Sequence, residues 1–303
     1  MGGDYNSKGI IPQGEERMKI GVFSILPNRD ADPAIVARKA EELGFDSYWV
    51  PDHTILPVHF SDAYPGVRPG APPPDYLWQM PDPLIALARA AAATSTIELG
   101  TGILLVPERN PLLAANMIAS LDHFADGRFL LGIGAGWNRP ECEILGGDFD
   151  HRWGQTKDYI LAMKALWTQD ESEYHGKYAD FPPVRCFPKP ARRPHPPVLL
   201  GGFTAERVYQ RIAEWGDGWL PVLTSVDQFR IGADKLQRAA EAVGRDYGAL
   251  TKTVFGIKDQ WHDPEDIRAF EAAGADRVTL WLPEDLHLEE LLREMERMAA
   301  RLL

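Results

Sequence analysis

The stretch DPAIVARKAEELGFDSYWVPDHTILP, residues 32–57, contains one complete step from helix to strand and shows how the chain is built. Asp32 is a plausible N-cap, a proline follows in the first turn, and Gly44 ends the helix that the apolar spacing predicts. The following DSYWV is typical of a short buried strand, and it runs directly into Asp52 and His53. The pattern predicts an α/β unit with two polar side chains at the carboxyl end of its strand.

The same alternation recurs along the chain. Strands are predicted at residues 19–25, 46–50, 96–106, 128–136, 196–202, 217–222, 251–258 and 275–282. Helices are predicted at residues 32–44, 82–94, 111–125, 155–167, 204–216, 225–244, 263–274 and 286–303. Eight such pairs in about 250 residues predict a (β/α)8 TIM barrel, an α/β fold whose parallel strands are buried on both faces. A doubly wound sheet is the alternative.

Two segments interrupt the alternation. A Pro-rich insertion follows the second strand, and residues 168–196, after the fourth helix, lack a sustained period and are expected to form a long loop. The predicted organisation is a flexible N-terminal tail, residues 1–18, followed by a single barrel domain, residues 19–303.

Composition restricts the partners. The 303 residues are 45% hydrophobic and carry a net charge of −12, which disfavours nucleic acid or an anionic membrane as the main partner and favours a small-molecule enzyme. No apolar run reaches about 18 residues, and the N-terminal residues lack the order of a signal peptide, so we expect a cytoplasmic protein. Cys142 and Cys186 form no CxxC pattern, which favours reduced thiols over a disulfide or zinc site.

The predicted strand ends carry most of the residues that could perform chemistry. In a barrel the active site lies where strands end and the following loops begin. Four strand ends should therefore meet on one rim. The residues at these ends are Asp52, His53, Gly102, Ile103, Trp137, Asn138, Gly201 and Gly202.

Two of these ends are rich in glycine. GIGAGWN, residues 132–138, fails the dinucleotide fingerprint because Trp137 stands where the third glycine is required. Its glycines either form a tight turn or let the backbone approach a flat ligand beside Trp137, and we favour the ligand. PPVLLGGFT, residues 196–204, places two glycines before a helix with Thr204 as its N-cap, which suits a phosphate, although an ordinary turn is equally consistent.

Asp52 and His53 admit several interpretations. A metal site would need more histidine and carboxylate ligands on other strand ends, and a hydrolytic triad would need a nucleophile on a G-x-S-x-G turn, so both are disfavoured and no metal is expected. A hydrogen-bonding Asp and a space-filling His would be a purely structural alternative. Their place at a strand end favours function, and an imidazole can polarise a ligand or move a proton near pH 7, so His53 is the candidate catalytic residue.

Several motifs together resemble the luciferase-like monooxygenase superfamily, and within it the flavin- or deazaflavin-dependent oxidoreductases of actinobacteria. The motifs are ELGFDSYWVPDHTILP, IELGTGILLVPERNPLLAANMIASLD, GRFLLGIGAGWN, PPVLLGG and GDGWLPV, and they extend in order over residues 19–282. The PDHTILP stretch and the insertion after it look most like the coenzyme F420 branch. The resemblance implies a (β/α)8 barrel, usually a homodimer, that holds a tricyclic ring in its mouth.

The resemblance also implies roles for individual residues. The Gly102–Ile103 bond would be a cis peptide in a bulge that supports the ring, and the glycine pair after the fifth strand would hold the phosphate. The implied cofactor-binding residues are Asp52, His53, Gly102, Ile103, Asn138, Gly201, Gly202, Phe203 and Thr204. Three tryptophans, Trp49, Trp78 and Trp137, are candidates for an apolar substrate wall.

Two departures from the pattern bear on the reaction. Ala135 stands where sugar-phosphate dehydrogenases of the F420 branch carry an acid, so the proton donor must come from elsewhere. Gln155 stands where relatives often carry an arginine, which leaves the phosphate mainly to backbone N–H groups. The leading hypothesis is an F420-dependent oxidoreductase that transfers a hydride between the deazaflavin and an unidentified organic substrate. The alternatives are an FMN-dependent luciferase-like monooxygenase and a non-catalytic deazaflavin carrier.

Overall fold

A computed structural model describes residues 18–25, 31–60, 72–202, 206–222, 224–256 and 263–303. Residues 1–17 of the predicted tail lie outside this range, as do Phe203 and Thr204 of the predicted phosphate site. Met18 is buried, and its N–H donates to the carboxylate of Glu271 at 3.1 Å. The flexible tail therefore stays a prediction for residues before Met18.

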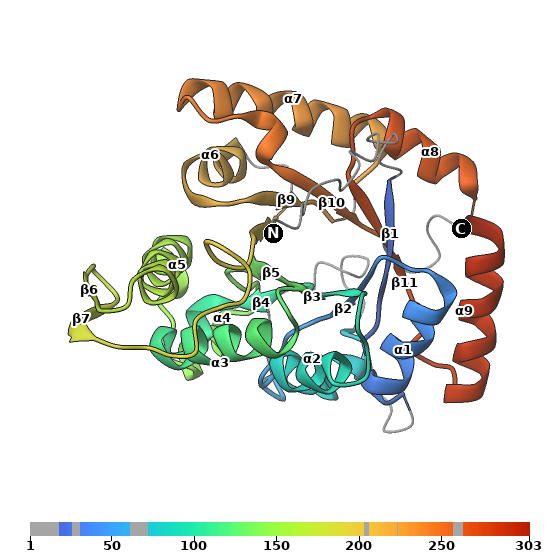
Figure 1. The fold of residues 1–303 in the computed structure, drawn as a ribbon, viewed down its shortest axis with the longest axis horizontal. Coiled ribbons are helices and arrows are strands. Elements are labelled where there is room, and N and C mark those ends of the chain that lie inside the picture. The colour runs from blue at the N-terminus through green and yellow to red at the C-terminus, as the bar shows by residue number, and fades with distance from the viewer. Residues whose placement is uncertain (1–17, 26–30, 61–71, 203–205, 223, 257–262) are drawn as a thin grey trace, which may run out of the picture.

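Parallel strands close into a barrel (Figure 1). Their order within the described residues is β3-β2-β1-β11-β10-β9-β8-β5-β4, and an additional pairing of β3 with β5 closes the ring. The strands are β1 (Lys19–Phe23), β2 (Ser47–Val50), β3 (Glu98–Thr101), β4 (Leu104–Leu105), β5 (Phe129–Gly134), β8 (Val198–Gly201), β9 (Gly218–Leu220), β10 (Thr251–Phe255) and β11 (Arg277–Trp281). Since β3 and β4 share one position in the ring, the predicted (β/α)8 barrel is confirmed.

Helices surround this barrel (Figure 1). The long ones are α1 (Pro33–Leu43), α2 (Pro83–Ala91), α3 (Pro111–Phe124), α5 (Arg152–Thr168), α6 (Glu206–Trp215), α7 (Val226–Ala242), α8 (Pro264–Ala272) and α9 (Leu288–Leu302). Asp32, Asp82 and Asn110 each precede a proline and accept a backbone N–H from the first turn of α1, α2 and α3. The shorter elements are α4 (Arg139–Ile144), η1 (Asp75–Trp78), η2 (Val106–Glu108), η3 (Phe149–His151) and η4 (Tyr247–Ala249).

The insertion after α5 contains an antiparallel hairpin rather than the long loop that was expected. Its strands, β6 (Ser172–His175) and β7 (Asp180–Val184), project beside α5 at the left of Figure 1. Asp158 on α5 holds the hairpin, because its carboxylate accepts the Tyr174 hydroxyl at 2.8 Å and the N–H groups of Tyr178 and Ala179. Two consecutive prolines in β7 interrupt the alternation of apolar and polar residues, so the sequence did not predict a strand here.

The interior of the barrel is filled by a separate cluster of large side chains. Trp49 is fully buried there, donates its indole N–H to Ser47 at 2.8 Å, and packs edge-on against Phe255 with ring centroids 5.3 Å apart. A Cβ on Gly100 would lie 2.1 Å from the Trp49 ring, so this glycine makes room for the indole. Trp49 therefore belongs to the packed interior rather than to a substrate wall, which corrects the sequence-based prediction.

A charge network closes the amino-terminal end of the barrel, opposite the predicted functional rim. Glu98 accepts Lys19 at 3.0 Å and Arg192 at 3.2 Å, and it also pairs with the buried guanidinium of Arg277. Burial alone would raise the pKa of Glu98, but Arg277 and Lys19 outweigh it and lower that pKa below its usual value. Glu98 thus provides the negative charge that lets Arg277 remain buried.

We expect Glu98→Gln to lower the free energy of unfolding by about 3 kcal/mol near pH 7, because it leaves the Arg277 charge buried without its counter-ion. Since folding lowers the pKa of Glu98, the stability that it contributes is present above the ordinary carboxyl pKa and is lost as pH falls through the folded-state pKa. Urea unfolding measured from about pH 7 to about pH 3 should show that the parent and Glu98→Gln become closer in their free energies of unfolding as pH falls. Glu171→Gln, which removes an exposed partner of Arg185, is the control. An undiminished difference in acid would contradict the proposed role.

Candidate functional site

A cavity of about 510 Å³ lies at the carboxyl ends of the barrel strands. Most of the residues predicted from the sequence line it. These are Asp52, His53, Gly102, Ile103, Trp137, Gly201 and Gly202. Asn138, Trp49 and Trp78 are not among the described residues that line it.

Small residues form one side of this cavity around the interruption between β3 and β4. The Gly102–Ile103 peptide bond is cis, which confirms the expectation from the resemblance. The Ile103 side chain fits between glycines of the neighbouring strands, since a Cβ on Gly134 would lie 1.9 Å from its Cδ1 and a Cβ on Gly201 3.0 Å from its Cγ2. Larger residues at Gly134 or Gly201 would therefore push Ile103 into the cavity and remove a surface on which a flat ring could lie.

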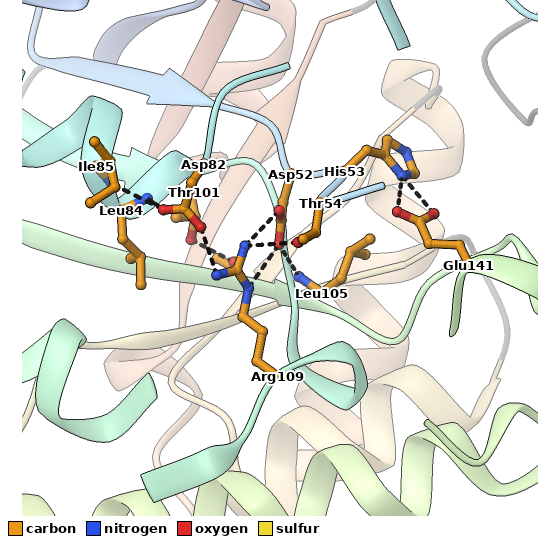
Figure 2. A network of polar contacts seen from close by, with 11 residues as sticks. Asp52, His53, Thr54, Asp82, Leu84, Ile85, Thr101, Leu105, Arg109 and Glu141 are labelled. Carbon is orange, nitrogen blue, oxygen red and sulfur yellow. Dashed lines mark hydrogen bonds and ion pairs between the residues drawn. The ribbon is translucent and has the colours of Figure 1, made fainter. Parts of the chain in front are cut away.

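Asp52 lines the cavity, and its carboxylate holds the backbone beside this surface in place. Only 3% of the residue is exposed, and its carboxylate accepts the Leu105 N–H at 3.0 Å and the Arg109 guanidinium at 2.8 Å (Figure 2). Arg109 is held in turn by Asp82 at 2.8 Å. Asp52 lines the cavity, but its carboxylate is already occupied, so the structure supports a structural role in anchoring β4.

His53 makes contacts through both ring nitrogens. Its Nδ1 lies 2.8 and 3.0 Å from the carboxylate oxygens of Glu141 on α4, as Figure 2 shows. Its Nε2 accepts the indole N–H of Trp137 at 3.2 Å, and the two rings meet edge to face. The sequence placed His53 and Trp137 on the rim but did not identify Glu141. A Glu within a short Pro-initiated helix gives no signal of a histidine partner 88 positions earlier.

Asn138 is buried at the start of α4 and does not reach the cavity. Its Oδ1 accepts the Glu141 N–H at 2.9 Å as the N-cap of this helix, and its Nδ2 has no partner in the described part of the chain. The prediction that Asn138 would hydrogen-bond a bound ring is therefore corrected. Its side chain caps the helix that carries Glu141.

Glu108, at the end of η2, is a second acidic residue that sequence reasoning missed. It is 5% exposed, and neither carboxyl oxygen has a partner among the described residues. Burial raises the pKa of Glu108 to about 9, and the nearby charges of Glu141 and Asp52 add to the effect. A Cβ on Gly136, which lines the cavity, would lie 2.9 Å from its Oε1, so Glu108 sits just behind the cavity wall in its protonated form near pH 7.

Two cations line the same cavity as the glycine pair after β8, and the sequence did not predict this. They are Arg152 of α5 and Arg211 of α6. Arg152 donates to the Gly136 carbonyl at 3.1 Å, and the Arg211 guanidinium lies over the Trp153 ring at 4.6 Å from its centroid. Two positive charges in the lining suit a ligand with a phosphate group.

Apolar side chains cover another part of the lining, and the residues are Phe23, Ile25, Met80, Val222, Phe255 and Trp281. Trp78 lies away from it: the residue is 41% exposed, and its ring is 6.2 Å from that of Phe60, which in turn contacts the Trp137 ring at 5.6 Å. The predicted substrate wall is thus corrected at Trp78 as well as at Trp49, and Trp137 alone of the three lines the cavity.

Comparison with known proteins identifies relatives over nearly the whole chain. The family model for luciferase-like monooxygenase matches residues 27–300. Uncharacterized protein Rv0953c of Mycobacterium tuberculosis is 34% identical over 285 residues, which cover 94% of this chain and 99% of the relative. F420-dependent glucose-6-phosphate dehydrogenase of Amycolatopsis mediterranei is 28% identical, over 88% of this chain and 75% of the relative. FMNH(2)-dependent dimethylsulfone monooxygenase of Pseudomonas putida is 29% identical, over 59% and 53%.

A solved structure shares the fold. Coenzyme F420 dependent tetrahydromethanopterin reductase from Methanopyrus kandleri superposes with a TM-score of 0.71 at 17% sequence identity, over 94% of this chain and 98% of the other. Among the described residues there is no group of three or more His, Cys, Asp or Glu arranged to hold a metal ion. None of the described helices is long and apolar enough to cross a membrane.

The raised pKa of Glu108 gives a testable pH dependence. Because folding raises this pKa, the stability of the protein falls as pH rises from the ordinary carboxyl pKa toward about 9. Glu108→Gln removes that titration, so we expect the variant to gain stability relative to the parent with rising pH, reaching about 4–5 kcal/mol near pH 8, since each pKa unit corresponds to about 1.4 kcal/mol. Urea unfolding at several pH values measures this gain, with exposed Glu290→Gln as the control. A difference that does not change with pH would show that Glu108 is ionised when folded.

Proposed function

Because the chain belongs to the luciferase-like monooxygenase family, which has F420-dependent and FMN-dependent relatives, we propose that it is an F420-dependent oxidoreductase that transfers a hydride between the deazaflavin and an organic substrate. The observation that carries the proposal is a cavity whose lining contains small residues around Ile103 and two cations, Arg152 and Arg211. F420 is the cofactor that we propose because the PDHTILP stretch resembles the F420 branch and an F420-dependent relative aligns with 88% of this chain.

The residues present fit such a cofactor. The ring would lie on Gly102, Ile103 and Gly134. A Cβ on Gly134 would push the Ile103 side chain into the space that the ring needs. Gly201 and Gly202 would approach the phosphate, and Phe203 and Thr204 remain predicted members of the same site. Arg152 and Arg211 line the same cavity and would add charge-assisted hydrogen bonds to backbone N–H groups. When bound, the deazaflavin would supply a ring carbon that accepts or donates the hydride.

The chain's own residues would orient the substrate and handle its proton. Trp137 and the apolar side chains at the cavity wall, among them Met80 and Trp281, would hold an organic substrate away from water. His53 is the proposed catalytic residue, since it lines the cavity and an imidazole can exchange a proton near neutral pH. Asp52 would bind the cofactor only indirectly, by anchoring β4 through the Leu105 N–H.

Cofactor binding tests the proposal first. Purified protein is expected to bind F420 in a fluorescence titration more tightly than FMN. Arg211→Gln should weaken F420 binding by about 10-fold or more, because a hydrogen bond to a charged group contributes about 1.5–3 kcal/mol. Arg207→Gln is the matched control, since Arg207 is an exposed arginine of the same helix and does not line the cavity. Tight binding of FMN and none of F420 would overturn the preferred cofactor, and equal effects of the two variants would remove Arg211 from the site.

Turnover separates an enzyme from a carrier. Bound F420, oxidised or reduced, is mixed with a panel of alcohols, enones and quinones, and its absorbance is followed in a single turnover. At least one member is expected to change the absorbance. A cofactor that stays unchanged with every member would favour a non-catalytic carrier, and consumption of oxygen with reduced FMN would favour a monooxygenase.

We also propose that the protein is a cytoplasmic homodimer. The exposed faces of α2 and α3 adjoin one another and carry large apolar side chains, with Ile85 64%, Leu113 67% and Phe124 78% exposed. A surface of this kind suits a second copy of the chain. Both cysteines are free, which agrees with a reducing compartment.

Light scattering tests the homodimer. The parent protein is expected to have twice the mass of one chain, and Leu113→Asp combined with Phe124→Asp should convert it to a monomer, because each change buries a charge in the proposed interface. Ile231→Asp is the control, since Ile231 is 56% exposed on α7, which lies across the barrel from α2 and α3 (Figure 1). A parent protein that is monomeric at micromolar concentration would contradict the proposal.

A further inference from the structure

A buried carboxylate on α4 touches the ring of His53. The side chains of His53 and Glu141 are 8% and 1% exposed, and the shorter of the two distances between Nδ1 and the carboxylate oxygens is 2.8 Å. Asn138 fixes the backbone of Glu141 by capping the helix. Glu141 is not among the described residues that line the cavity, so it contacts His53 from behind the cavity wall.

Trp137, the third residue in this contact, determines which ring nitrogen of His53 carries the proton. An indole N–H can only donate a hydrogen bond, so the Nε2 atom of His53, 3.2 Å from the Trp137 Nε1, must present a lone pair. A neutral imidazole with a free lone pair on Nε2 carries its proton on Nδ1. That proton points at Glu141, which is therefore the accepting carboxylate. Together Trp137 and Glu141 select one tautomer of His53.

We propose that Glu141 is the positioning residue of His53, which keeps the proton of the imidazole on Nδ1 and leaves Nε2 as the basic atom at the cavity. This role rests on the proposed oxidoreductase function. In the oxidation of an alcohol, Nε2 would accept the O–H proton as the C=O bond forms, and a bound deazaflavin would supply the acceptor for the C–H hydride. Reduction of a carbonyl would reverse both transfers. Glu141 would stabilise the imidazolium that exists between them.

The Trp137 N–H donates to the same His53 atom, Nε2, that would accept the proton of a substrate hydroxyl. Both Trp137 and His53 line the cavity. A substrate that gives its proton to His53 must therefore displace this N–H first. The Trp137 indole would act as a stand-in for the substrate hydroxyl, marking where that group binds.

Other charged groups surround the pair from the neighbouring elements. Asp52 follows β2 and is paired with Arg109, and Glu108 lies on η2 without a partner in the described chain. Burial raises the pKa of Glu141, the contact with His53 opposes this, and Asp52 adds to the rise. A carboxylate with a raised pKa attracts the shared proton more strongly than an exposed one does, which suits a residue that supports a changing charge on His53.

Nitrogen-15 NMR of the cofactor-free protein tests this assignment. Chemical shifts of the His53 ring in the parent should show a neutral ring protonated on Nδ1, with Nε2 bare. In Glu141→Gln both neutral tautomers of His53 should be populated, because a glutamine amide can meet Nδ1 either as a donor or as an acceptor. In Trp137→Phe the proton should stay on Nδ1, because Glu141 still accepts it. Glu143→Gln, an exposed change on the same helix, should leave the tautomer as it is in the parent.

Kinetics provide the second measurement. In Glu141→Gln the value of kcat/KM is expected to fall about 100-fold. A His53 ring that stays protonated on Nδ1 alone in Glu141→Gln would overturn the positioning role. The two proposals fail separately: absence of F420 and FMN binding removes the proposed function, while the NMR result on the cofactor-free protein decides the role of Glu141.

Discussion

The hydrogen bond from the Leu105 N–H to the Asp52 carboxylate is the contact on which the rim of this barrel depends. The ladder is interrupted between β3 and β4, so the backbone after Ile103 needs another anchor to return to the ring. Asp52 supplies it from the end of the neighbouring strand, and Arg109 compensates the buried charge. Ile103 can then pack between the glycines of β5 and β8, which creates the surface along one side of the cavity.

Much of this architecture follows from local patterns in the sequence. The strand-helix alternation and the Asp-Pro helix starts each report on neighbouring residues, and both were predicted correctly. The hairpin after α5 was missed because Pro182 and Pro183 break its alternation and because its anchor, Asp158, lies on the preceding helix. A contact between two separate elements produces no periodic pattern in the sequence, so such a pattern cannot predict it.

The same distinction separates the parts of the site that could be predicted from those that could not. Strand ends locate residues on the rim, which brought His53, Ile103 and Trp137 to the cavity. The position alone does not say which way a side chain points, and so Trp49 turned out to fill the barrel interior. Arg211 and Glu141 come from helices that become part of the site only after the barrel has closed, and no spacing in the sequence joins them to the glycines or the histidine.

Three buried carboxyl groups lie close together at this cavity, and each is accommodated in a different way. Asp52 is paired with the guanidinium of Arg109, Glu108 keeps a proton because its pKa is raised to about 9, and Glu141 is hydrogen-bonded to the imidazole of His53. Protonating Asp52 would leave Arg109 with Asp82 alone, and ionising Glu108 would bury a charge that has no partner within the described chain. On the proposed function, the Glu141 carboxylate would be the counter-ion of an imidazolium formed at His53. His53 is the member of this pair that lines the cavity, so a proton exchanged with a substrate would pass through its ring.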